Sequence, residues 1–183
     1  AAVTYSVGPT GDFATLDSVM NTLNVCGIGG AVTFELQTGT FSTGQSLGEV
    51  NGGSSTNTIT FTGAAGASDT LVSISLDGAS NIVLDDLFIY NMNSDAIVLN
   101  GTENVTITNN RIEVTTTSTS TLAGLPIVSR SGQYYYNGST ESNLTIAHNE
   151  LIGGYFGIAM YGTSSNPSSN VHVAHNEFRG QYY

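Results

Sequence analysis

The sequence contains no Lys, and its only cationic side chains are those of three Arg residues. Charged residues make up 9% of the chain, against about 25% in an ordinary soluble domain. Fourteen acidic residues against three basic ones give a formal net charge of -11. Because binding to phosphates requires Lys and Arg side chains that displace counterions, this composition excludes a nucleic-acid partner and attraction to an anionic membrane surface.

Long apolar runs and paired cysteines are also missing. No run reaches the roughly 18 apolar residues of a membrane span, so we expect no membrane insertion. Cys26 is the single cysteine, which excludes an internal disulfide, and its apolar neighbours predict a small buried side chain. The Ala1-Ala2 start is typical of a mature chain after signal-peptide cleavage, so we expect a secreted or cell-surface protein.

The sequence does contain an internal repeat. Five segments begin with Asn and then alternate apolar and polar residues, and their starts are 24, 23, 39 and 27 residues apart. Alternation of this kind predicts strands with one buried face. The segments are 57–61, 81–84, 104–107, 143–146 and 170–173, with a degenerate copy at 31–36. We predict one continuous buried stack of Ile82, Leu84, Val105, Ile107, Leu144, Ile146, Val171 and Val173.

Three copies continue into a second shared pattern, at 109–112, 148–151 and 175–178, in which one Asn recurs. This Asn falls where the chain turns sharply between two strands, and we expect it to adopt the left-handed backbone geometry that Asn tolerates. Its side chain can also bond to its counterpart in the next coil. Further strands are predicted at 95–99, 125–128 and 156–160, which gives about three strands a coil. The residues of the predicted ladder are Asn110, Asn149 and Asn176.

A coil of about 23 to 27 residues cannot bury its own inner face, but coils stacked about 4.8 Å apart share one apolar core. The predicted fold is therefore all-β: a right-handed parallel β-helix, a solenoid of about six coils with a short N-terminal capping α-helix. The segments "NVTITNNRIEV", "NLTIAHNELIGGYFGIAMYG" and "NVHVAHNEF" resemble the parallel β-helix repeat family, the pectate-lyase-like superfamily. "GDFATLDSVMNTLN", followed by "GGAVTFELQTGTF", resembles the cap and first coil of secreted bacterial β-helix proteins.

The expected organisation is a single domain over residues 1–183. Residues 1–30 form the cap, with a helix at about 15–24 that begins after an N-cap at Thr15. Residues 31–183 form the coils, with an insertion at about 113–142. Since no cap follows Phe178, we expect a fragment of a longer chain whose C-terminal end is covered by further coils, another domain or a partner.

Two groups of residues are candidate binding sites. Asp85, Asp86 and Asp95 form either a calcium site or a set of turn acids bonded to backbone amides. Tyr134, Tyr135 and Tyr136 in the insertion, together with Tyr161, are candidates for stacking on sugar rings or contacting another protein. The tyrosines of the insertion can equally pack on the coils. No cofactor other than calcium is indicated.

Two histidines share a repeat position. His148 and His175 should stack one coil apart, as should Glu150 and Glu177, and Arg111 takes the position of these Glu residues in the coil before. This arrangement suits a metal site, an acid–base pair or a plain surface ladder at a turn.

Catalytic residues are not apparent. The resemblance implies either lyases with a Lys or Arg base in an acidic groove or hydrolases with clustered Asp, and this chain has no Lys. On the strands that contain Ile97 and Ile158, the outward positions are Val98, Asn100, Ala159 and Tyr161, which do not transfer protons at neutral pH.

We therefore predict a non-catalytic domain of a secreted or cell-surface protein: an adhesin, a stalk or a module that contacts carbohydrate. Its partner would be a polysaccharide or another surface protein. The alternative is a truncated polysaccharide lyase or glycoside hydrolase whose catalytic coils lie beyond residue 183. Ice binding, a third function, requires flat ranks of Thr; Thr106 and Thr145 align, but Val83 and His172 interrupt them.

Overall fold

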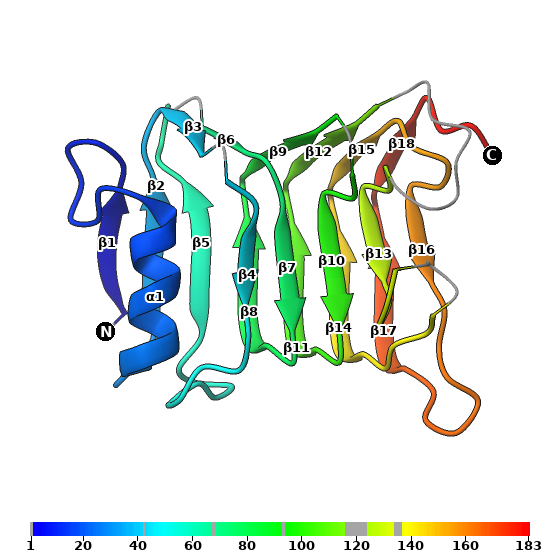
Figure 1. Cartoon of the computed structure of the whole chain (residues 1–183), viewed down its shortest axis with the longest axis horizontal. Helices are drawn as coiled ribbons and strands as arrows, with labels where there is room; N and C mark the ends of the chain where they lie inside the picture. The colour runs from blue at the N-terminus through cyan, green and yellow to red at the C-terminus, as the bar shows by residue number, and fades with distance from the viewer. Residues whose placement is uncertain (1, 42, 67–68, 93, 116–123, 134–136) are drawn as a thin grey trace.

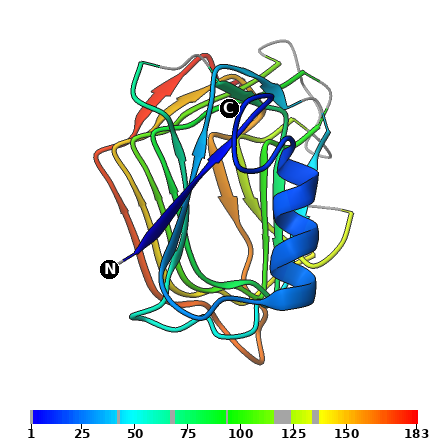
Figure 2. The same ribbon diagram turned by 90° about the vertical axis from the view of Figure 1, so that its left-hand side faces the viewer.

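The computed structural model describes residues 2–41, 43–66, 69–92, 94–115, 124–133 and 137–183. These described residues wind into a parallel β-solenoid of about six coils and include one short helix, as predicted (Figure 1). Every paired strand runs parallel to its neighbours, so each coil contributes successive strands to successive sheets. Figure 2 looks along the stack from its N-terminal end and shows the coils superimposed.

Three sheets run the length of the stack. Sheet A contains β1 (Val3–Val7), β2 (Val32–Leu36), β5 (Ile59–Gly63), β8 (Ser80–Asp85), β11 (Glu103–Thr108), β14 (Ser142–Ala147) and β17 (Ser169–Ala174). Sheet B contains β3 (Gly39–Phe41), β6 (Asp69–Leu71), β9 (Phe88–Asn91), β12 (Arg111–Val114), β15 (Glu150–Ile152) and β18 (Glu177–Arg179). Sheet C contains β4 (Gln45–Leu47), β7 (Ile74–Asp77), β10 (Ile97–Asn100), β13 (Ile127–Ser129) and β16 (Ile158–Met160).

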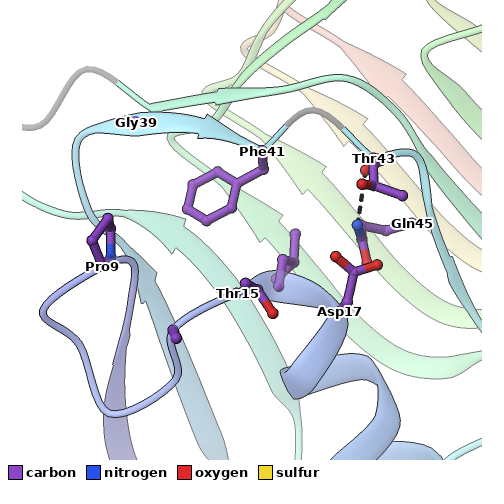
Figure 3. A pocket seen from close by; sticks show the side chains of 9 residues that line it. Pro9, Thr15, Asp17, Gly39, Phe41, Thr43 and Gln45 are labelled. Carbon is purple, nitrogen blue, oxygen red and sulfur yellow. Dashed lines mark hydrogen bonds between the residues drawn. The ribbon is translucent and has the colours of Figure 1, made fainter.

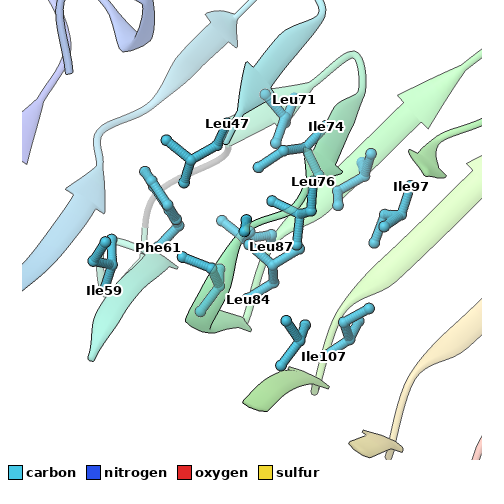
Figure 4. Close-up of a cluster of buried hydrophobic side chains, with 14 of the residues drawn as sticks. Leu47, Ile59, Phe61, Leu71, Ile74, Leu76, Leu84, Leu87, Ile97 and Ile107 are labelled. Atoms are coloured by element: carbon cyan, nitrogen blue, oxygen red, sulfur yellow. The ribbon is translucent and has the colours of Figure 1, made fainter. Parts of the chain in front are cut away.

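The inward side chains of all three sheets form one apolar core (Figure 4). Six of the eight residues predicted for the sheet A stack are fully buried there. The prediction was wrong for Val171 and Val173, which are 36% and 47% exposed. They lie on β17, the last strand of sheet A, where no described strand packs against its outer edge. The six buried residues are Ile82, Leu84, Val105, Ile107, Leu144 and Ile146.

Helix α1 (Leu16–Cys26) covers part of the N-terminal end of the stack and contacts β4 (Figure 2). Thr15 is its N-cap, because its side-chain oxygen accepts a hydrogen bond from the Ser18 N–H. The helix extends two residues beyond the predicted end. The burial predicted for Cys26 was wrong: its position on the last turn faces the side chain to solvent. Strand β1 was also missed, since it was assigned to the cap but joins sheet A beside β2.

The turn between sheets A and B differs in one detail from its prediction. The residue in left-handed conformation is not the recurring Asn but the residue before it, with φ between 52° and 59°. This residue keeps its side chain outside, whereas the Asn turns inward. The left-handed residues of this turn are Asp86, Asn109, His148 and His175. Within the described part of the chain, no helix is long and apolar enough to cross a membrane.

Candidate functional site

The recurring Asn side chains form a ladder inside the turn between sheets A and B. The backbone N–H and the Nδ2 group of Asn110 both donate to Oδ1 of Asn149, each over 3.0 Å. Asn149 donates in the same way to Asn176, over 3.0 and 2.9 Å. Leu87 takes the equivalent place in the coil before Asn110, and the backbone N–H of Leu87 donates to Oδ1 of Asn110. The amides of Asn110 and Asn149 are buried and that of Asn176 is partly buried, and all three form hydrogen bonds between coils.

The three predicted calcium ligands are not brought together. Asp85 and Asp86 lie before β9, whereas Asp95 lies beyond its other end. Oδ1 of Asp85 accepts a hydrogen bond from Nδ2 of Asn109 over 2.8 Å. The described residues contain no group of three or more His, Cys, Asp or Glu arranged to hold a metal ion.

Asp95 instead forms a buried ion pair on the side of sheet C. Its Oδ2 lies 2.7 Å from a guanidinium nitrogen of Arg130, and its Oδ1 accepts the Leu125 N–H over 2.9 Å. Burial raises the pKa of this carboxyl above its ordinary value, while the Leu125 N–H and Arg130 act in the opposite direction. Because Asp95 lies in the preceding coil and bonds to both Leu125 and Arg130, it anchors the segment around residues 124–130 to that coil.

Apolar side chains close the outer face of sheet C over its last coils. Val128 is fully buried and Ala159 is 7% exposed, although both point outward from the coil. They form a second apolar cluster with Leu125, and Tyr155 and Phe156 pack against it.

The predicted tyrosines are divided between described and undescribed parts of the chain. Tyr161 follows β16 and is 54% exposed, and its backbone carbonyl accepts the Ser139 N–H. Tyr134, Tyr135 and Tyr136 lie outside the described residues. The proposed role of all four in ligand contact stays a prediction.

Glu141 is a buried carboxylate that sequence reasoning missed. It is fully buried, and its Oε2 accepts hydrogen bonds from the backbone N–H and the hydroxyl of Thr102. Its Oε1 accepts the Ser129 hydroxyl over 2.9 Å. Nothing in the repeat indicated this role, because the equivalent positions hold Ala79, Thr102 and Ser168. Hydrogen bonds from Thr102 and Ser129 hold the Glu141 carboxylate in place, so its role is structural.

The two predicted histidines do stack at an exposed turn. The ring centroids of His148 and His175 are 4.9 Å apart and the rings are 11° from parallel. Both residues have the left-handed φ that the turn requires. Among the described residues around them, no third His, Cys, Asp or Glu completes a group that could hold a metal ion.

A small pocket that the sequence did not predict lies between the start of α1 and the loop from β3 to β4 (Figure 3). Its volume is about 260 Å³, and its wall combines the Phe41 ring with the side chains of Asp17 and Gln45. Gln45 is 5% exposed and its Nε2 donates to the Thr43 carbonyl over 2.8 Å. Asp17 is the one acidic side chain among the described residues that line this pocket.

Comparison with known sequences gives one result. The family described as the right handed beta helix region matches residues 26–183. No curated protein and no solved structure matches the chain.

Proposed function

The chain belongs to the right-handed β-helix family, and from that premise we propose that it is a non-catalytic module of a secreted or cell-surface protein. As an adhesin, stalk or carbohydrate-contacting domain, it would present its rigid outer surface to a polysaccharide or to another surface protein. The exposed apolar side chains of the last coil, Val171, Val173 and Phe178, would be covered by further coils, another domain or a partner.

The observation that carries this proposal is the burial and hydrogen bonding of the carboxylates beside sheet C. Glycoside hydrolysis needs two carboxyl groups about 5–10 Å apart that reach the scissile bond, and proton abstraction needs an accessible base. Asp95 and Glu141 are buried, and each is already bonded to structural donors. Asp77, at the end of β7, is exposed, and its Oδ1 accepts a hydrogen bond from Nδ2 of Asn100 over 2.6 Å. Arg130 is held against Asp95 by an ion pair of 2.7 Å.

The test is turnover on anionic and neutral polysaccharides by the 183-residue chain. Incubation with pectin, alginate and neutral glucans should give neither unsaturated ultraviolet-absorbing products nor new reducing ends. Products that disappear in the Asp86→Asn variant would instead show that residues 1–183 are themselves catalytic and would overturn the proposal. Retention in gels that contain polysaccharide measures the carbohydrate contact independently of any turnover.

A further inference from the structure

The outer face of sheet B combines aromatic rings with a network of ion pairs. Phe88 and Tyr90 both point outward from β9, and their ring centroids are 6.1 Å apart. In the next coil, Arg111 lies beside Phe88 and Glu113 lies beside Tyr90. The following strands bring Glu150 into register with Arg111, and Glu177 into register with Glu150. We call Phe88, Tyr90, Arg111, Glu113, Glu150, Glu177 and Arg179 the sheet B face.

Two of the three cations in the chain lie on this face, and both are paired. Arg111 contacts Glu113 over 2.9 Å and Glu150 over 3.2 Å. Arg179 contacts Glu150 and Glu177, each over 2.8 Å. The Arg111 guanidinium also lies over the Phe88 ring, 5.5 Å from its centroid. These contacts fix donors and acceptors at set positions beside the rings.

The network remains open to a ligand. The Arg111 and Arg179 side chains are 50% and 56% exposed, and those of Glu113 and Glu150 are 27% and 24% exposed. A guanidinium has more N–H donors than these pairs use, and a carboxylate has further lone pairs. A pyranose ring presents the complementary groups, because its C–H face can stack on an aromatic ring while its hydroxyls both donate and accept.

We propose that the sheet B face binds a neutral glycan chain, with one sugar ring stacked on Tyr90 and its hydroxyls bonded to Arg111 and Glu113. This inference rests on the carbohydrate-contacting part of the proposed function and assigns it a surface and a ligand class. The ligand is neutral because the face holds three Glu against two Arg, all in ion pairs, and the chain carries a net charge of -11. A polyanion would meet net repulsion there.

The experiment measures dissociation constants by affinity gel electrophoresis in soluble neutral polysaccharides: xyloglucan, galactomannan and mixed-linkage glucan. Tyr90→Ala should weaken binding about tenfold to whichever polysaccharide the wild type binds, because it removes the stacking surface. Tyr90→Phe keeps the ring and should stay within about twofold of the wild type. Thr106→Ala, an outward substitution on sheet A, is the matched control and should leave binding unchanged.

A second variant covers the case in which Tyr90→Ala does not fold. Glu113→Gln keeps the shape of the side chain but loses one charged acceptor and the ion pair with Arg111, so binding should weaken severalfold. Circular dichroism and thermal melting establish that each variant is folded.

The outcomes separate this inference from the proposed function. If the wild type binds a neutral glycan and Tyr90→Ala binds it equally well, the sheet B face is not the site, although the module still contacts carbohydrate. If only Tyr161→Ala loses binding, the glycan lies beside sheet C. The sheet B face is then not the site, although the module still contacts carbohydrate. Equal binding of pectate would overturn the neutral ligand class. If the wild type binds no glycan, the carbohydrate-contacting function fails together with this site.

Discussion

At the scale of single residues, the carboxyl group of Asp95 experiences two opposing effects. Burial raises its pKa above the ordinary 3.8, and this effect outweighs the Leu125 N–H and Arg130. The native state therefore keeps a proton at pH values where the unfolded chain has lost it. The contribution of Asp95 to stability is greatest below pH 3.8 and falls as the pH rises through the native pKa.

Urea unfolding of the wild type and of Asp95→Asn tests this sign. We expect the free energy of unfolding of the wild type, minus that of the variant, to fall as the pH rises from 3.8 through the native pKa of Asp95. The other titrating groups are common to both proteins and cancel in the difference. A difference that grows with pH would show that attraction to Arg130 outweighs burial and lowers the pKa.

The Asn ladder gives a second prediction at this scale. Asn149→Ala removes the acceptor of the Asn110 N–H and the bond from Nδ2 of Asn149 to the Ile107 carbonyl. Because these groups are buried, the variant should lose about 2–3 kcal/mol of unfolding free energy. Asn21→Ala, on the exposed side of α1, should change it by less than about 0.5 kcal/mol. If urea unfolding gives the same loss of unfolding free energy for the two variants, the Asn ladder does not stabilise the fold.

At the scale of elements, a helix or strand with a local residue pattern was predictable from the sequence, whereas the pairing of strands β1 and β2 was not. Helix α1 was found because its apolar positions and its Thr15 cap lie within one short segment. Strand β1 was missed because only its pairing with β2, nearly thirty residues later, makes it part of sheet A. The left-handed residue at each turn was placed one position too late, since Asn suits both the turn and the ladder.

The same distinction explains the candidate sites. Alignment of Leu87 with Asn110 already places Phe88 beside Arg111, so the sheet B face had a sequence signal in the register of two copies. The Asp95–Arg130 pair had none, because Arg130 lies in the interval 113–142, where the repeat does not fix the register. For the same reason the sequence grouped Asp95 with Asp85 and Asp86.

At the scale of the whole molecule, a solenoid is stabilised by contacts between neighbouring coils. The repeat spacing predicted this architecture because each Asn-led segment supplies the same inward positions to the core. A central coil has neighbours on both sides, whereas β17 has a described neighbour on one side only. The cost of the same truncation should therefore depend on where its coil lies in the stack.

Ile107→Ala and Val173→Ala test this dependence at equivalent positions of sheet A. Ile107 is fully buried between β8 and β14, and neighbouring coils restrict collapse into the space it leaves, so its truncation should cost on the order of 2–5 kcal/mol. Val173 is 47% exposed, so its truncation should cost about 1 kcal/mol or less. Urea unfolding of the 183-residue chain measures both, with Thr106→Ala as the outward control. Similar losses for the two core variants would mean that the end coil packs as tightly as the centre, which its exposed apolar side chains contradict.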